Sequence, residues 1–380
     1  MPRDKKSSQW WMYNQIHENA HSCAGLLEEM LHRNSKFQIS VFLLVCKKDI
    51  HNVFTSSEPF KFVINYGSGN DDNSIFTIQV AKNDEGRKEE FGNVLIVRTS
   101  AKEVYLAITD EPRVFVESVL RPFLNSYYPD ISRAFLSASD LQQMLELLEN
   151  TTGDRIIVDR ITAYRRISYE VPINIKNKKE KRVETKESAV TYTRRPYRES
   201  FNDAIANDQW VDKVQFQLIG ETSVKMKAYF SRNGLFKFRH SFIPFYQAIL
   251  PFIIEIIDKK FKLYSNRSRV ADKVKPSPLV IDLDYDVFSD TIQNHRFIES
   301  LKKMSYASTS VYHSNPYVHL SLVDYLDGSS FDIWVLSANR ITIVPQLRAS
   351  EASVARLMNH IFERFREGNV REYEGYVKSR

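Results

Sequence analysis

Short runs of alternating apolar and polar residues, joined in pairs by tight turns, constrain the fold of this 380-residue chain most strongly. "NVLIVRTSAKEVYLAI" predicts two strands that turn near Thr99 to Lys102, and "SVKMKAYFSRNGLFKFRH" predicts a hairpin around Asn233-Gly234. Asp327-Gly328 marks another turn near the C-terminus. Strands joined by short turns are antiparallel, because parallel strands need long crossovers. We therefore expect an α+β protein of mostly antiparallel hairpins, each followed by a packing helix, rather than a doubly wound parallel sheet.

Helical periodicity follows the hairpins in each third of the chain. Helices are expected over about residues 10–33, 113–125, 138–149, 243–258 and 288–304, and over an amphipathic stretch that stops at Gly368. Gly153 and the polar segment "SNRSRVADKVKPSPL" mark the expected boundaries. They divide the chain into two or three subdomains: an N-terminal α+β domain (1–152), a basic central domain (153–275) and a C-terminal α+β domain (276–380).

The composition indicates a folded protein from a reducing compartment. Apolar residues make up 43% of the chain and aromatic residues 12%, which is enough for packed interiors and excludes global disorder. Two cysteines, Cys23 and Cys46, cannot build a disulfide framework. The start of the chain lacks the apolar core of a secretory signal, and the longest apolar run, Phe242 to Ile257, is too interrupted for a membrane span. We expect a cytoplasmic protein with no membrane association.

The charge is distributed unevenly along the chain. The net charge is +6, but residues 155–275 hold 26 Lys and Arg against 13 Asp and Glu. The two flanks together hold 27 against 34, so a basic middle lies between mildly acidic ends. Such an internal asymmetry points to a polyanionic partner more strongly than the isoelectric point of the whole chain does. The same pattern also fits a plain solvated surface, or a surface for an acidic protein or an anionic membrane.

Three stretches of the basic middle supply the candidate nucleic-acid-binding residues. Long-range attraction would come from a lysine-rich segment, at Lys178, Lys179, Lys181 and Arg182. Phosphate contacts would come from Arg160, Arg165, Arg166, Arg194, Arg195 and Arg198, with base stacking by Tyr192 and Tyr197. Strand alternation places Lys225 with Lys227, and Lys237 with Arg239, on faces of the Asn233-Gly234 hairpin. We predict a nucleic-acid-binding component of a multi-protein system, non-catalytic and without a cofactor or metal, whose cations form one continuous surface.

A metal-dependent hydrolase or nuclease is the first alternative. His17, Glu18 and His21 spell the His-Glu-x-x-His pattern of zincin-type metallopeptidases, in which two histidines one helical turn apart bind zinc. On a helical wheel, however, both histidines lie on the wet flank of the apolar stripe, which favours a surface helix. Glu184-Thr185-Lys186 matches the end of a PD-(D/E)xK nuclease motif, but its surroundings are polar and typical of a loop.

A second acidic pattern follows an apolar strand near residue 282. "PLVIDLDYD" places Asp282 and Asp284 on one strand face, where two carboxylates could hold Mg²⁺. This stretch resembles the first motif of haloacid-dehalogenase-like phosphatases, with Tyr285 and Asp286 departing from it. A structural turn at a strand end accounts for the same residues.

The second alternative is a protein-interaction scaffold that binds no nucleic acid. The acidic flanks and the terminal amphipathic helix are candidates for docking a protein partner.

Overall fold

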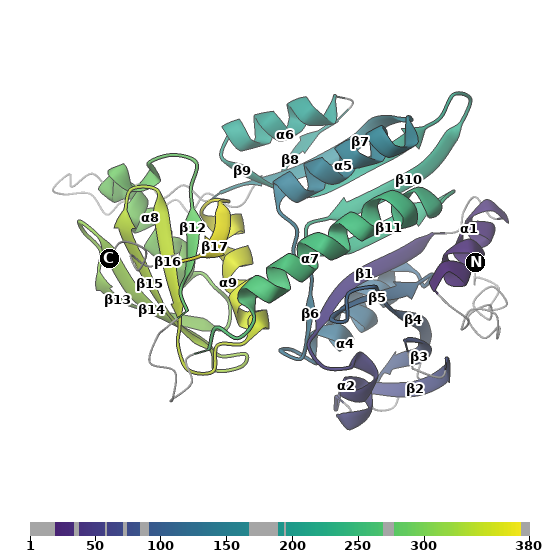
Figure 1. Cartoon of the computed structure of the whole chain (residues 1–380), viewed down its shortest axis with the longest axis horizontal. Helices are drawn as coiled ribbons and strands as arrows, with labels where there is room; N and C mark the ends of the chain where they lie inside the picture. Colours follow the sequence, from purple (N-terminus) through teal and green to yellow (C-terminus); the bar gives the residue numbers. More distant parts are fainter. Residues whose placement is uncertain are drawn as a thin grey trace, which may run out of the picture. The chain divides into compact units, whose positions relative to one another are not determined.

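In the part of the chain that the structure describes, the strands form two antiparallel sheets, of eleven and six strands, with helices packed on them (Figure 1). The computed structural model describes residues 20–33, 38–57, 59–70, 74–83, 91–166, 189–193, 195–268 and 277–373. Strands that lie far apart in the sequence also pair antiparallel. This arrangement confirms the predicted α+β class.

The larger sheet has the strand order β2-β3-β4-β5-β1-β11-β10-β9-β7-β8, with β6 paired to β1. The central strand, β1, pairs with β5 on one side and with β11 on the other. A strand from the first fifty residues therefore joins the early hairpins to the hairpins from the middle of the chain. The strands are β1 (Ile39–Cys46), β2 (Phe62–Gly69), β3 (Ile75–Lys82), β4 (Gly92–Arg98), β5 (Val104–Thr109), β6 (Ile131–Arg133), β7 (Arg155–Arg165), β8 (Ala189–Tyr192), β9 (Gln209–Ile219), β10 (Val224–Ser231) and β11 (Leu235–Arg239).

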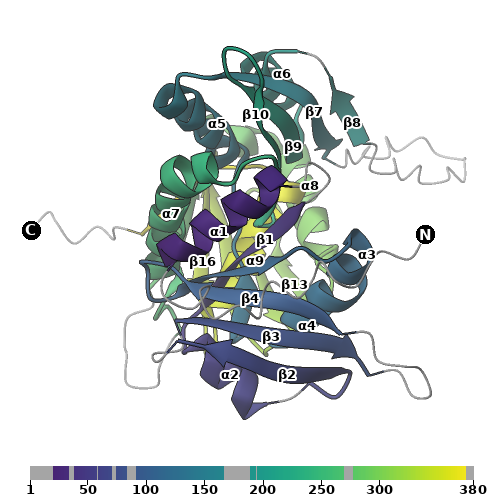
Figure 2. The ribbon, with the colours of Figure 1, turned by 90° about the vertical axis from the view of Figure 1, so that its right-hand side faces the viewer.

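Helices cover both faces of the larger sheet. In Figure 2, α5 and α7 lie to the left of β10 and β1, and α3 lies to the right. Residues 113–125 form one helical segment with a π-helical middle, as the sequence predicts for this range. The helical elements of this part are α1 (Ala20–Arg33), α2 (Ile50–Ser56), α3 (Arg113–Phe115), η3 (Val116–Leu120), α4 (Arg121–Asn125), α5 (Ala138–Thr152), α6 (Tyr197–Ala206), η4 (Phe245–Ile249) and α7 (Leu250–Tyr264).

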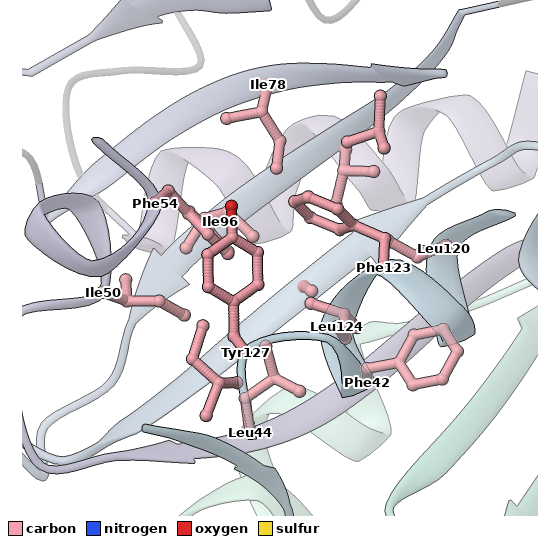
Figure 3. Close-up of a cluster of buried hydrophobic side chains, with 14 of the residues drawn as sticks. Phe42, Leu44, Ile50, Phe54, Ile78, Ile96, Leu120, Phe123, Leu124 and Tyr127 are labelled. Atoms are coloured by element: carbon pink, nitrogen blue, oxygen red, sulfur yellow. The ribbon is translucent and has the colours of Figure 1, made fainter. Parts of the chain in front are cut away.

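Strand alternation gives the larger sheet two apolar layers. On one face, the rings of Phe54, Phe123 and Tyr127 pack together within a buried cluster, with ring centroids 5.0–5.5 Å apart (Figure 3). On the other face, the ring of Phe230 lies 5.2 Å from Phe236 and 5.9 Å from Phe245 of η4. Burying rings of this size supplies much of the hydrophobic stabilisation of a domain.

The smaller sheet has the order β13-β14-β15-β16-β12-β17, and its apolar side chains are buried on one face. The predicted hairpin is present: β14 and β15 pair antiparallel, and Gly328 in the turn between them takes a positive φ of 78°. The expected helices near residues 288–304 and 351–365 are also present. The elements are β12 (Leu279–Asp282), η5 (Val287–Ser289), α8 (Thr291–Lys302), β13 (Ala307–His313), β14 (Val318–Asp324), β15 (Ser330–Ser337), β16 (Arg340–Pro345), α9 (Glu351–Arg364) and β17 (Asn369–Glu372).

The chain forms two compact units that interleave in sequence. The first unit comprises Met1–Thr162, Thr191–Asp203 and Val211–Lys260, and the second comprises Ala163–Val190, Ala204–Trp210 and Phe261–Arg380. The apolar stretch from Phe242 contributes to η4 and α7, and none of the helices in the described part of the chain is long and apolar enough to cross a membrane.

Candidate nucleic-acid interface

Two of the predicted cations, Lys227 and Arg239, lie directly opposite each other in the larger sheet. Lys227 on β10 pairs with Arg239 on β11 and, on its other side, with Gln217 on β9. Residues directly opposite in an antiparallel sheet point to the same face. Both cationic side chains are exposed. Asp159 of β7 accepts a hydrogen bond from the amide Nε2 of Gln217 at 2.8 Å, so an acidic group stands at the end of this row.

A second row on the same face continues the positive charge. Tyr229 and Lys237 are opposite each other on β10 and β11, two residues along from Lys227 and Arg239. The ammonium of Lys237 lies 5.6 Å from the centre of the Tyr229 ring. Ser231 lies opposite Lys213 in the next row. Three consecutive rows of this face therefore each carry a cation.

The helical segment 113–125 adds two arginines next to these rows. Arg113 and Arg121 are close enough to Lys237 to influence its protonation, together with Lys213 and Glu117. Arg121 forms an ion pair with Glu117 at 2.8 Å, one helical turn away. We call this surface the basic face, and it carries six cations and three carboxylates: Arg113, Arg121, Lys213, Lys227, Lys237 and Arg239, with Glu117, Asp159 and Asp212.

The charges of the basic face affect the ionisable groups on it. Burial lowers the pKa of Lys237 below its ordinary value, and the neighbouring Arg113 and Arg121 lower it further against the opposing effect of Glu117. Burial also lowers the pKa of His240, with contributions from Lys227 and Arg239. Like charges make a further proton unfavourable. At both residues burial has the largest effect on the pKa, and the neighbouring cations add to it.

Tyr229 is the aromatic residue of the basic face. Burial, and then the Asp212 carboxylate, raise the pKa of its phenol to about 12, so the group stays neutral at physiological pH. Asp212 is itself largely buried, which raises the pKa of its carboxyl, and its carboxylate lies 3.5 Å from Lys213. With Lys237 over its ring, Tyr229 is better placed to hold the lysine than to stack on a base.

Several other predicted cations are held by carboxylates. Arg198 contacts Glu146 and Glu149, each at 3.4 Å, and Arg195 contacts Asp203 at 2.9 Å. These partners reduce the positive charge that the α6 region presents to solvent.

Two further residues of the prediction are also engaged in contacts within the protein. Lys225 contacts Asp154 at 2.8 Å, and the β10 register shifts at this residue, which takes it out of the row of Lys227. The Tyr197 side chain is buried, and its hydroxyl donates to Glu149 at 2.9 Å. Its ring is packed inside the protein and is not presented for stacking.

The predicted residues of β7 and β8 fall into separate environments. Arg160 and Arg165 are exposed, whereas the Arg166 side chain is only 6% exposed and forms an ion pair with Asp208 at 3.3 Å. Tyr192 of β8 is half-buried. The remaining predicted residues lie outside the described part of the chain: Lys178, Lys179, Lys181, Arg182 and Arg194.

The acidic pattern after β12 is occupied by arginines. The Asp282 carboxylate accepts hydrogen bonds from Arg340, with Nε at 2.9 Å, and from Arg371. Burial alone would raise the pKa of Asp282, but these two guanidinium groups lower it below its ordinary value. Asp284 is exposed. Two guanidinium groups at the carboxylate would repel a divalent cation, so this geometry favours a structural strand-end role.

The histidine pattern of the first helix falls largely outside the described residues. His17 and Glu18 lie outside the described residues. Helix α1 begins at Ala20, so His21 is in its first turn. Further along α1, Glu28 accepts hydrogen bonds from the backbone N–H groups of Phe242 and Ile243, the latter at 2.9 Å. Glu28 therefore caps the start of the helical segment that begins at Ile243 and continues into η4 and α7. Among the described residues, no group of three His, Cys, Asp or Glu side chains is arranged to hold a metal ion.

The basic face also includes residues that were not predicted from the sequence: Arg113, Arg121, Lys213 and Tyr229. Lys213 and Gln215 alternate with buried residues on β9, which is a signal of a solvent-facing strand face. The helix at 113–125 could be predicted, but its position beside β10 and β11 depends on the sheet order. Comparisons with models of known protein families and with curated proteins find no match for this chain.

Proposed function

We propose that this protein binds nucleic acid through the basic face, as a non-catalytic component of a larger assembly. The observation that carries the proposal is the row in which Lys227 and Arg239 stand directly opposite each other, exposed, with Lys237 and Lys213 in the next rows. Residues rise about 3.4 Å along an antiparallel strand, so adjacent rows lie about 6.8 Å apart, and long cationic side chains in them can reach neighbouring phosphates of one backbone. Like charges directly opposite each other in a sheet are destabilising, and a phosphate bound between Lys227 and Arg239 would offset their repulsion.

The chemistry of the basic face favours phosphates over bases. Its cations outnumber its carboxylates six to three, and its one aromatic ring, Tyr229, is half-buried beneath Lys237. Phosphate contacts supply affinity and carry no sequence information directly. We therefore expect binding that depends strongly on salt and weakly on base sequence, for DNA and RNA alike.

Charge reversal on the basic face provides the first test. The variant K227E/R239E should bind a fluorescently labelled oligonucleotide about tenfold or more weakly than the wild type, because two phosphate contacts become repulsive. Both side chains are exposed, so the fold should tolerate the change. Fluorescence anisotropy at a fixed salt concentration measures the two dissociation constants.

The control has the same change in net charge elsewhere in the first unit. Lys61 and Lys102 are exposed residues at β-hairpin ends of the larger sheet, away from β9 to β11. The variant K61E/K102E should retain wild-type affinity. Equal losses in both variants would show a general effect of net charge, and unchanged binding by K227E/R239E would rule out the basic face as the interface.

The other predictions about partners and location belong to this proposal. The lysine-rich segment at 178–182 would add long-range attraction to the same polyanion. A protein partner would dock on the acidic flanks, and the assembly would reside in the cytoplasm. If an acidic protein rather than nucleic acid were the partner of the basic face, K227E/R239E would abolish its capture while oligonucleotides bound equally to the wild type and both variants.

A further inference from the structure

Three arginines converge on one carboxylate in the second compact unit. Asp208, just before β9, accepts hydrogen bonds from Arg166 at 3.3 Å, Arg296 of α8 at 3.3 Å and Arg366, after α9, at 3.2 Å. All four residues belong to the second unit. We call them the Asp208 cluster. Three positive charges share one negative charge, which leaves a local excess of two.

The arginines of this cluster retain hydrogen-bonding capacity. A guanidinium group has five N–H donors. In the described part of the chain, the side chain of Arg296 donates to Gln293 and Asp208, and that of Arg366 donates to Asp208. The side chains of Arg296 and Arg366 are 20% and 23% exposed, so the remaining donors can be reached from solvent. Asp208 is 32% exposed.

The most buried member fixes the arrangement. Arg166 is 6% exposed and donates one N–H to the Gln209 carbonyl at 3.1 Å and another to the Phe362 carbonyl at 3.0 Å. These contacts tie the end of β7 to β9 and α9. Two other carboxylates of this unit that pair with arginine are closer to charge balance: Asp282 is shared by two arginines, and Asp324 forms an ion pair with Arg356. Of these three carboxylates, Asp208 has the largest excess of positive charge around it.

An exposed aromatic ring adjoins the cluster. The guanidinium of Arg366 lies 4.6 Å from the centre of the Tyr285 ring, and Tyr285 is 54% exposed. Planar guanidinium groups bind phosphate oxygens with two parallel hydrogen bonds, and aromatic rings stack on bases. A ligand that carries a phosphate dianion next to a base matches both features: the phosphate would neutralise the excess of two charges, and the base would stack on the face of the exposed Tyr285 ring opposite Arg366.

We propose that the Asp208 cluster is a binding site for a phosphomonoester attached to a nucleoside. Two sources carry this group: a free nucleoside monophosphate and the 5′-phosphate end of a nucleic acid. The site lies in a different unit from the basic face and does not depend on it. It adds end recognition to a protein whose other contacts follow the phosphate backbone.

The test compares oligonucleotides that differ only at the 5′ end. The full-length wild type should bind a 3′-labelled, 5′-phosphorylated oligonucleotide about tenfold more tightly than its 5′-hydroxyl counterpart, as expected for added charge-assisted hydrogen bonds. Adenosine monophosphate, titrated alone by calorimetry, tests the free nucleotide. Competition by adenosine monophosphate would assign the site to nucleotides generally, and a 5′-end preference without competition would assign it to nucleic-acid ends.

Two matched variants locate the site. R296Q/R366Q should lose the preference for the 5′-phosphate and any binding of adenosine monophosphate. R340Q/R371Q removes the two arginines that pair with Asp282 in the same unit. This variant should retain the 5′-phosphate preference and any binding of adenosine monophosphate. If R296Q/R366Q fails to fold, the single variant R366Q, which loses one hydrogen bond to Asp208, should show the same loss.

Failure of this proposal can be told apart from failure of the basic face. K227E/R239E should weaken both oligonucleotides equally and leave the tenfold ratio between them unchanged. If no oligonucleotide binds the wild type, calorimetry with adenosine monophosphate alone decides. Equal binding of the two oligonucleotides together with no heat from adenosine monophosphate would overturn the proposal, as would a preference that survives in R296Q/R366Q.

Discussion

At the scale of single residues, carboxylates decide which cations this protein presents to solvent. Arg198, Lys225 and Arg166 contact acidic groups between 42 and 71 positions away in the sequence. No local pattern reveals such partners, because they are set by the packing of distant elements. Lys227 and Arg239 could be predicted to share a face, since they flank one tight turn and strand alternation is local.

The ion pairs at Asp282 predict a pH dependence of stability. The folded-state pKa of Asp282 is lowered relative to the unfolded state. The pairs therefore stabilise the fold above about pH 3.9, the unfolded pKa of aspartate, and this stabilisation is lost as the pH falls through the lower folded value. At neutral pH, D282N should lower the free energy of unfolding by about 0.5–1 kcal/mol, since the groups are partly exposed.

Urea unfolding at several pH values measures this effect. The difference between the wild type and D282N should be constant from about pH 5 to 8 and shrink below about pH 4. D284N, which alters an exposed neighbour, should follow the wild type throughout. A difference that grew at acid pH would contradict the assigned ion pairs.

At the scale of elements, hairpins and long helices follow from local sequence, whereas short or edge elements do not. The β10–β11 turn and the capping box of α5 at Ser137 are encoded within a few residues. The small helix α6 was not predicted from the sequence, and β13 and β17 are edge strands with little apolar periodicity. The formation of these two edge strands depends on pairing with the rest of the smaller sheet.

Gly234 should be the least replaceable residue of the hairpin formed by β10 and β11. Its φ of +66° disfavours any side chain, and a Cβ would lie 2.9 Å from the Ala134 carbonyl oxygen and 3.2 Å from that of Leu43. G234A should lower the free energy of unfolding by about 2–3 kcal/mol, which combines the left-handed backbone cost with a backbone clash. Chemical denaturation monitored by circular dichroism measures the loss.

A substitution at Gly153 separates the cost of the left-handed backbone from the cost of the backbone clash. It has nearly the same φ of +68°, but a Cβ there would meet nothing within 4 Å. G153A should therefore cost only the conformational part, about 1 kcal/mol. Equal losses in the two variants would show that the close approach at Gly234 contributes nothing.

At the scale of the whole molecule, the charge asymmetry of the sequence is partly retained and partly neutralised. The middle of the chain is basic in sequence, yet Arg198 of α6 contacts the acidic residues Glu146 and Glu149 of α5. The basic face instead draws Arg113 and Arg121 from the first third. The fold class could be predicted from alternation alone, but the membership of this surface depends on which strands pair with β1 and β9, and that pairing is long-range.

The salt dependence of nucleic-acid binding tests the basic face most directly. A plot of log K against log salt for duplex DNA should be linear with a slope of about −4 to −5, since four to six cations displace counterions at about −0.9 per phosphate contact. K227E/R239E should reduce the magnitude of that slope by about 2, while K61E/K102E retains it. A flat plot for the wild type, or an unchanged slope for K227E/R239E, would contradict phosphate binding by this surface.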